Sequence, residues 1–261
     1  MGFIEFASQH GLIIDNVVLD RWTRVPTEDK PHKKNGSYIF DGYGGAVQNW
    51  AVHEKPILFN ERNPFKVVDM QKVRKDQEVL NGKAREKAQF MFYNAKISKH
   101  PYLARKGFPE LGSLVWNSLL LVPMYKNGLV GCQMIDPDGE KRFLKGQRSK
   151  GASHTLGSGG RDILVEGYAT GLSVHKVLTE ANVEHTIHVC FSAGNMLEIA
   201  RDKRNPLVIA DHDKVGIKTA QSIGQYWLSN KEGEDFNDAL KRGYIGNIIE
   251  LSKTRDGKLN R

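Results

Sequence analysis

Two stretches decide the fold of the C-terminal half, ILVEGYATGLS at residues 163–173 and VIADHDKVGIKTAQ at residues 208–221. Each begins as a short apolar run, reaches an acidic residue and continues as sequence with helical spacing. The same alternation recurs between them. The predicted strands are 163–165, 186–191 and 206–210, and the predicted helices are 168–181, 196–203 and 214–228. Near-continuous apolar strands that alternate with helices indicate a parallel sheet covered on both faces.

Acidic side chains follow the first and the third of these strands. Glu166 ends the first, and Asp211 and Asp213 end the third. Ligands of open α/β sheets gather at the carboxyl ends of the strands, so the three acids are expected at one edge. In an extended chain Asp211 and Asp213 would face the same way, with His212 on the other side. Three converging carboxylates repel one another without a cation, and oxygen ligands suit Mg²⁺ or Mn²⁺.

These two stretches, followed by GEDFNDAL at 233–240, resemble the Toprim domain, and more narrowly the Toprim-type primases of phages and plasmids. Three upstream runs are similar to the small basic subdomain that precedes Toprim in those proteins. They are HPYLARKG at 100–107, LLLVPMY at 119–125 and LVGCQMIDPDGEKRFLKGQ at 129–147. The resemblance covers about residues 99–240. It implies an α/β fold, with a Toprim-like parallel sheet flanked by helices and preceded by a small basic antiparallel α+β subdomain.

The expected organisation has four parts. They are a small α+β N-terminal segment at 1–60, a basic helical segment at 61–98, a basic primase-like subdomain at 99–157 and a Toprim domain at 158–261. In the third part Asn127-Gly128 predicts a hairpin between strands 119–125 and 129–135, because a type I′ turn needs positive φ at both positions. The glycine-rich stretch at 157–160 is interpreted as a linker.

The resemblance also implies roles for the acids. Glu166 would be the general acid/base or a metal-proximal carboxylate, and Asp211 and Asp213 would hold Mg²⁺ or Mn²⁺. Asp235 and Asp238 match a later acidic motif, in which Asp235 is the better ligand candidate. The alternative for both is a helix N-terminus, where acids complement the helix dipole.

The charge balance favours a polyanionic partner. Lys and Arg number 38 against 30 Asp and Glu, which gives a net charge of +8. Residues 61–100 carry a net +5, either as a solvated helix face or as an arm along nucleic acid. Residues 141–150 hold five cations and no acid. The expected phosphate-binding wall, whose alternative is a solvated ridge, consists of Arg105, Lys106, Lys141, Arg142, Lys145, Arg148 and Lys150. Ser192 and Asn195 are expected either to approach a phosphate or to cap a helix.

Cysteine usage excludes a structural zinc ribbon, so no zinc is expected. Cys132 and Cys190 are the two cysteines, and they form no CxxC pair. Many phage primases carry a zinc ribbon that helps to choose the template site. Either template selection falls to residues 1–95, or a partner supplies it, or the protein is not a conventional primase. Unwinding would fall to a separate helicase. The sequence contains neither a signal peptide nor a membrane span, so we expect a cytoplasmic protein of a bacterial or phage-infected cell.

The expected activity is DNA-directed synthesis of short RNA primers from NTPs on single-stranded DNA. Two alternatives stay open. One is a Toprim nuclease that cuts DNA with the same carboxylates, and the other is a nucleic-acid-binding protein whose Toprim core has lost catalysis.

Overall fold

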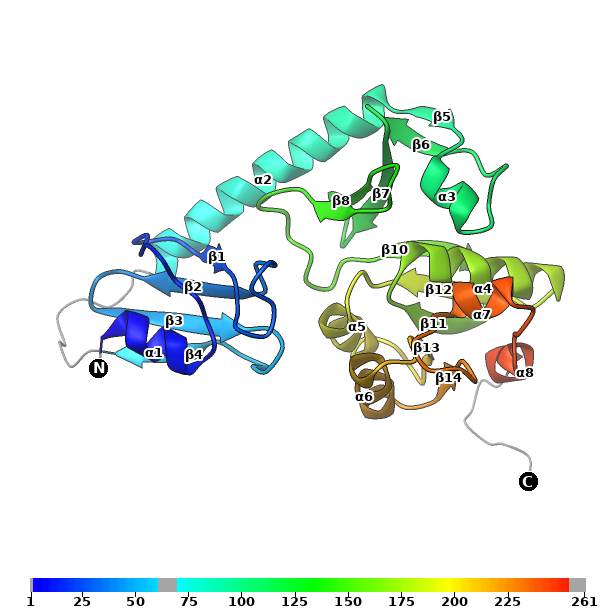
Figure 1. Ribbon diagram of the computed structural model, residues 1–261. Coiled ribbons are helices and arrows are strands. Elements are labelled where there is room, and N and C mark those ends of the chain that lie inside the picture. Colours follow the sequence, from blue (N-terminus) through cyan, green and yellow to red (C-terminus); the bar gives the residue numbers. More distant parts are fainter. Residues whose placement is uncertain (1, 61–69, 254–261) are drawn as a thin grey trace. The chain divides into compact units, whose positions relative to one another are not determined.

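The structure is a computed structural model that describes residues 2–60 and 70–253. The chain divides into two compact units, Met1–Val79 and Leu80–Arg261, and the division falls inside helix α2 (Met70–Asn94). Among the described residues, no helix is both long enough and apolar enough to cross a membrane. Both units combine helices with sheets, as Figure 1 shows.

Residues 2–60 of the N-terminal unit form a four-stranded antiparallel sheet with one short helix, α1 (Phe3–Gln9). The strands follow chain order. They are β1 (Thr23–Val25), β2 (Gly36–Phe40), β3 (Gly44–Asn49) and β4 (Ile57–Asn60). Aromatic rings fill its core: Phe3 stacks on Phe40 at 4.1 Å between ring centroids and meets Phe59 edge-on.

The C-terminal unit begins with an antiparallel meander beside the second half of α2. Its strand order is β5-β6-β7-β8-β9. The strands are β5 (Lys96–Ser98), β6 (Ser113–Trp116), β7 (Leu119–Tyr125), β8 (Leu129–Ile135) and β9 (Lys141–Phe143), with helix α3 (Pro101–Arg105) between β5 and β6. Ala84, Ala88 and Met91 of α2 pack on one face of the meander, against Leu121 and Cys132. The predicted hairpin is confirmed, and both residues of its turn have positive φ.

The second sheet of this unit has the strand order β10-β12-β11-β13-β14. Four strands are parallel, and β10 runs antiparallel to β12 at one edge. Five helices accompany it. The elements in chain order are β10 (His154–Ser158), β11 (Arg161–Val165), α4 (Tyr168–Glu180), β12 (His185–Val189), α5 (Ala193–Ala200), β13 (Leu207–Ala210), α6 (Lys214–Ile223), β14 (Tyr226–Leu228), α7 (Phe236–Lys241) and α8 (Ile248–Lys253).

Both faces of the central strands β11 and β13 are buried, which explains why residues 163–165 and 207–210 are apolar. Ile163 and Val165 point into a cluster shared with α4, α7 and α8. Leu164 points the other way, into a cluster with Met196 of α5 and Ala220 of α6. The alternation follows from the two-residue period of a strand. The helices cover the two faces in this way in Figure 1.

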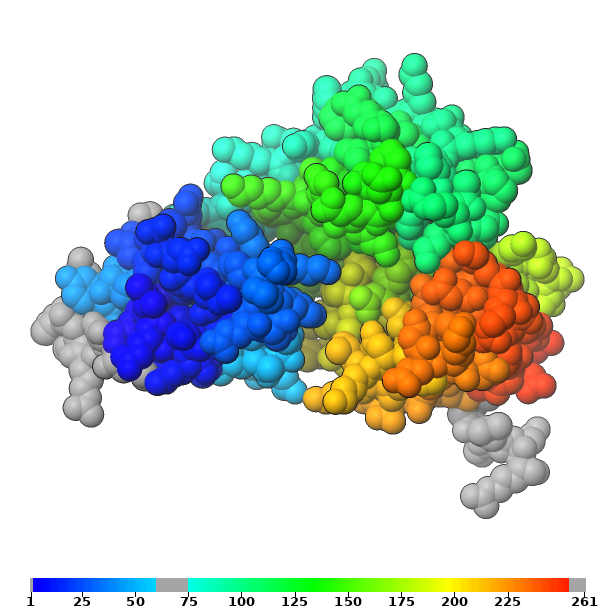
Figure 2. All heavy atoms as spheres, in the orientation of Figure 1, coloured from blue at the N-terminus to red at the C-terminus, as the bar shows by residue number. Residues whose placement is uncertain are grey.

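Contacts between the two sheets hold the C-terminal unit together. Leu120 and Val122 of β7 pack with Ala169 and Leu172 of α4, so α4 lies between the meander and the second sheet. The side-chain amide of Asn237 in α7 donates to the carbonyl of Lys106 just after α3, at 2.7 Å. In Figure 2 the green atoms around α3 lie against the orange atoms of α7.

Two expectations about this unit are wrong. The glycine-rich stretch at 157–160 is no linker: residues up to Ser158 form β10, and Gly159 and Gly160 turn the chain with positive φ. The helix predicted at 214–228 ends at Ile223. Gly224 adopts a φ of 146°, which stops the helix, and residues 226–228 add the strand β14 in parallel to β13.

Candidate active site

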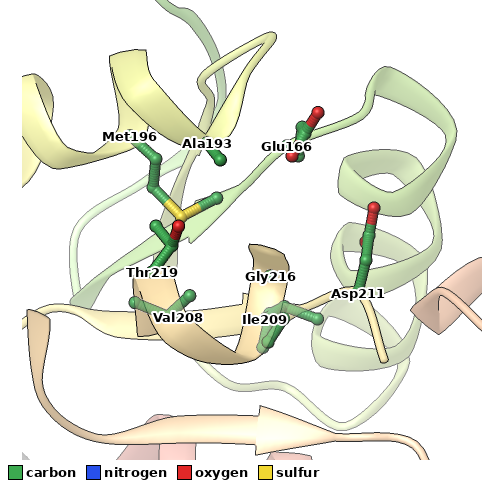
Figure 3. A pocket seen from close by; sticks show the side chains of 9 residues that line it. Glu166, Ala193, Met196, Val208, Ile209, Asp211, Gly216 and Thr219 are labelled. Atoms are coloured by element: carbon green, nitrogen blue, oxygen red, sulfur yellow. The ribbon is translucent and has the colours of Figure 1, made fainter. Parts of the chain in front are cut away.

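Glu166 and Asp211 lie at the same edge of the second sheet. Glu166 directly follows β11, and Asp211 directly follows β13, the neighbouring parallel strand. Both line a small cavity with Met196, Val208 and Thr219, which Figure 3 shows. The placement follows from the topology, because the carboxyl ends of adjacent parallel strands meet at one edge.

Asp211 has a buried carboxyl whose ionised form is disfavoured. Its Oδ1 atom is buried and has no hydrogen-bond partner among the described residues. Burial raises the pKa of its carboxyl to about 7, and the neighbouring carboxylates Glu166, Asp235 and Asp213 add to the rise. Gly216 is needed here: a Cβ at this position would lie 2.4 Å from the carbonyl oxygen of Asp211. The first turn of α6 therefore closes over the Asp211 backbone.

The expected geometry of Asp211 and Asp213 is wrong. Strand β13 ends at Ala210, and the backbone N–H of Asp213 donates to the carbonyl of Asp211 at 2.8 Å. This turn replaces the extended chain that would have aimed both carboxylates the same way. Asp213 instead caps α6, where its Oδ1 accepts from the N–H of Gly216 at 2.7 Å. His212 contacts the carbonyl of Ser229 through Nδ1.

Asp235 also caps a helix. It begins α7, and its Oδ1 accepts from the N–H of Asp238 at 2.8 Å. The ammonium of Lys106 lies 4.0 Å from the other oxygen of Asp235 and 3.9 Å from Asp238. These contacts agree with the helix-terminus interpretation of Asp235. The negative charge of Asp235 also raises the pKa of Asp211.

The acids influence one another without forming a closed ligand cage. Within residues 2–60 and 70–253, no three His, Cys, Asp or Glu side chains are grouped closely enough to hold a metal ion. Burial raises the pKa of Glu166, with Asp213 adding to the rise. Mg²⁺ usually binds one or two carboxylates, substrate phosphates and water instead of an all-protein cage. The unpartnered oxygen of Asp211 fits such an open site.

The positive charge of Lys141 acts on Glu166 and Asp211. It lowers the pKa of both Glu166 and Asp211, against the effect of burial. The ammonium nitrogen of Lys141 lies close to the backbone after Glu166, since a Cβ atom added at Gly167 would be 4.0 Å from that nitrogen. Strand β9 thus brings one positive charge to the carboxylate edge. Arg142, the next residue, bonds Glu140 at 2.7 Å and lies 3.8 Å from Asp136, so its charge is paired within its own hairpin.

The other cations of the predicted wall lie in different settings. Lys106 faces the acids at the start of α7, as described above. Arg105 donates to the carbonyl of Pro137, which ties α3 to the β8–β9 turn. Lys145 and Arg148 are exposed, and Lys150 is 3.6 Å from Glu198 of α5.

Ser192 and Asn195 organise the start of α5. The hydroxyl of Ser192 accepts from the N–H of Asn195, as an N-cap does. The amide of Asn195 accepts from Gly151 N–H at 2.6 Å and donates to the carbonyls of Ala152 and Cys190 at 2.8 Å. These contacts favour the helix-cap interpretation of this segment.

Sequence reasoning missed two aromatic side chains at this edge. Phe143 of β9 and Phe191, which follows β12, are in ring contact. The sequence does contain a signal for Phe143. It lies two residues after Lys141, and residues at that spacing share one face of a strand, so both side chains are expected on the same face. Phe191 had none, because its conformation depends on contacts from distant segments.

Comparisons with known proteins give structural likeness at low identity. No protein-family model matches the chain. One similar chain belongs to a structure of the bacteriophage T7 lagging-strand DNA polymerase interacting with primase domains bound to an RNA/DNA hybrid and dTTP. It has a TM-score of 0.44 and 16% identity over 62% of this chain and 93% of that chain. The primase fragment of the bacteriophage T7 primase-helicase protein has a TM-score of 0.40 and 15% identity, over 58% of this chain and 71% of that one.

Proposed function

We propose that the protein is a metal-dependent nucleotidyltransferase, a Toprim-type DNA primase that makes short RNA primers on single-stranded DNA. The observation that carries the proposal is the carboxylate edge. Glu166 and Asp211 follow adjacent parallel strands, the charge of Lys141 acts on both, and the Oδ1 of Asp211 is buried without a hydrogen-bond partner among the described residues. Its substrates would be NTPs and a DNA template, and unwinding would come from a separate helicase.

The roles of the side chains follow from charge and burial. Asp211 would hold Mg²⁺ or Mn²⁺ through its buried, unpartnered Oδ1. Asp213, whose Oδ1 caps α6, would contribute its other carboxylate oxygen. The metal, when bound, would stabilise the negative charge that develops on the phosphoryl group during transfer. Glu166 would accept or return a proton at this edge, and burial raises the pKa of its carboxyl above the usual value, which favours the protonated form. Lys141 would bind a phosphate at the same edge.

The deciding experiment is primer synthesis with the purified chain. The reaction contains random single-stranded DNA, radiolabelled NTPs and either Mg²⁺ or Mn²⁺, and the products are separated on a denaturing gel. We expect new RNA products that require NTPs, template and metal together. DNA shortened in the absence of NTPs would instead support the nuclease. DNA binding with neither reaction would support a catalytically inactive protein.

The exposed cations after β9 provide a prediction about DNA binding. Replacing Lys145, Arg148 and Lys150 together with Ala should weaken binding of single-stranded DNA of every sequence. Each lost phosphate contact should flatten the slope of log K against log salt by roughly 0.7, so the slope should change by up to about two units. Fluorescence anisotropy of a labelled oligonucleotide at several salt concentrations measures the slope.

A matched variant controls for net charge. Lys176, Arg204 and Lys253 are exposed cations on other elements, and Arg204 lies before β13, away from the carboxylate edge. Their replacement with Ala removes the same charge and should leave the slope closer to that of the wild type. An unchanged slope in the first variant would assign residues 145–150 to a solvated ridge.

A further inference from the structure

An exposed aromatic ring stands beside the carboxylate edge. Phe143 of β9 leaves 42% of its surface open to solvent. It shares a face of β9 with Lys141, whose charge reaches Glu166 and Asp211. Arg142 lies between them in sequence and bonds the acids of the hairpin turn instead. The strand therefore presents one cation and one aromatic ring together.

The ring of Phe191 packs against the ring of Phe143. The two ring centroids are 6.1 Å apart with an interplanar angle of 86°, which is the favoured edge-to-face contact. Phe191 itself packs against the hydrophobic clusters on α4 and under the meander. Its backbone N–H donates to the carbonyl of Glu166 at 2.9 Å. Through Phe191, the position of Phe143 is fixed relative to Glu166.

The backbone at Phe191 has an unusual conformation. Its φ is 66°, in the left-handed region that a bulky aromatic residue rarely adopts. Such strain persists only where the surrounding structure imposes it, and it concentrates at functional sites. Here it coincides with the hydrogen bond to Glu166 and with the ring contact to Phe143. Through these two contacts, the exposed ring of Phe143 lies at the same sheet edge as Glu166.

We propose that Phe143 is the stacking platform for the base of a nucleotide whose phosphate is bound at Lys141 and the carboxylate edge. An exposed aromatic face next to a cation binds nucleobases of any sequence, because every base has a π-face. The inference rests on the proposed function, since it assigns the base of the same ligand whose phosphate that function requires. The base belongs either to an incoming NTP or to single-stranded DNA, and binding experiments distinguish the two sources.

The test compares three ligands on wild type and Phe143→Ala at a fixed Mg²⁺ concentration. The ligands are ATP, a fluorescein-labelled oligothymidylate and inorganic tripolyphosphate, which carries the phosphates without a base. We expect Phe143→Ala to weaken binding of ATP or of the oligonucleotide by about tenfold, as loss of one stacked base does. Binding of tripolyphosphate should stay unchanged. The ligand that is weakened identifies the source of the base.

Two further variants make the result specific. Phe143→Trp keeps an aromatic face and should retain affinity. Phe90→Ala on α2 is a matched control, because Phe90 is also exposed, at 60%, and also has an edge-on partner, Trp116 at 6.3 Å. It should bind as the wild type does.

The outcomes separate this inference from the proposed function. Primer synthesis by the wild type together with unchanged affinities in Phe143→Ala would overturn the stacking platform alone. Equal weakening of tripolyphosphate would also overturn it, since the effect would then lie in the phosphate site. A wild-type protein that binds neither ATP nor DNA would remove both proposals.

Discussion

Asp211→Asn should abolish metal-dependent product formation and leave the folded protein as stable as the wild type, or more stable, in metal-free buffer at neutral pH. Activity should be lost because Asp211 is the proposed metal ligand that carries a buried, unpartnered carboxylate oxygen. Stability is kept because the folded state no longer holds an ionised carboxyl among Glu166, Asp213 and Asp235. Gel assays measure the first effect and thermal unfolding the second.

The pH dependence of this stability has a definite sign. The pKa of Asp211 is raised from 3.8 to about 7 on folding, so the folded state favours the protonated form. The stability that this provides is fully present below about pH 4 and is lost as the pH rises to about 7, at about 1.4 kcal/mol per pKa unit. Asp211→Asn should therefore become increasingly more stable than the wild type as the pH rises from 4 to 7. At pH 8, Mg²⁺ should raise the melting temperature of the wild type more than that of the variant.

A control separates this site from general effects of charge. Asp202 is an exposed acid after α5, and Asp202→Asn removes the same charge elsewhere. It should keep full activity and the wild-type response to Mg²⁺. Full activity in purified Asp211→Asn would remove Asp211 from the metal site.

Glu166→Gln should lower turnover by a hundredfold or more, while binding of Mn²⁺ and of DNA changes little. General acid/base groups typically contribute 10²–10⁴-fold to a rate. Glu166 suits that role because it ends β11, on the strand next to the Asp211 and Asp213 segment, and because burial raises its pKa. Single-turnover rates, with binding measured separately, check the prediction.

The metal concentration decides between two roles for Glu166. A variant that recovers its rate at high Mn²⁺ would show that Glu166 is a ligand and not an acid/base. Glu180→Gln is the matched control: Glu180 is exposed at the far end of α4, the helix that Glu166 precedes. It should turn over as the wild type does.

Local signals predicted the parts of the fold that depend on neighbouring residues. Strands 119–125 and 129–135 have the predicted bounds, since Asn127-Gly128 supplies the turn that their pairing requires. The strand β14 was missed because its three residues are stabilised by pairing with β13, which no local pattern reveals. The glycines at 157–160 were wrongly interpreted as a linker, because the strand β10 that ends there is stabilised by pairing with the distant β12.

The sequence likewise predicts one part of the candidate site and not the other. Sequence order and strand polarity suffice to bring Glu166 and Asp211 to one edge, because both follow buried parallel strands. The turn from Asp211 to Asp213 depends on where β13 stops and on the capping of α6, so its geometry was not predictable. The pairing of Arg142 with Glu140 and the fold of Phe191 against Phe143 also arise from tertiary contacts.

The amides of Asn195 and Asn237 have a consequence for how the C-terminal unit loses its structure. Asn195 joins the connection before β10 to the end of β12, and Asn237 joins the end of α3 to Ser173 of α4. Loss of either sheet would also expose apolar faces of α4, because α4 packs against both sheets. The meander and the parallel sheet should therefore unfold as one cooperative block, with matched protection of their backbone amides against hydrogen exchange.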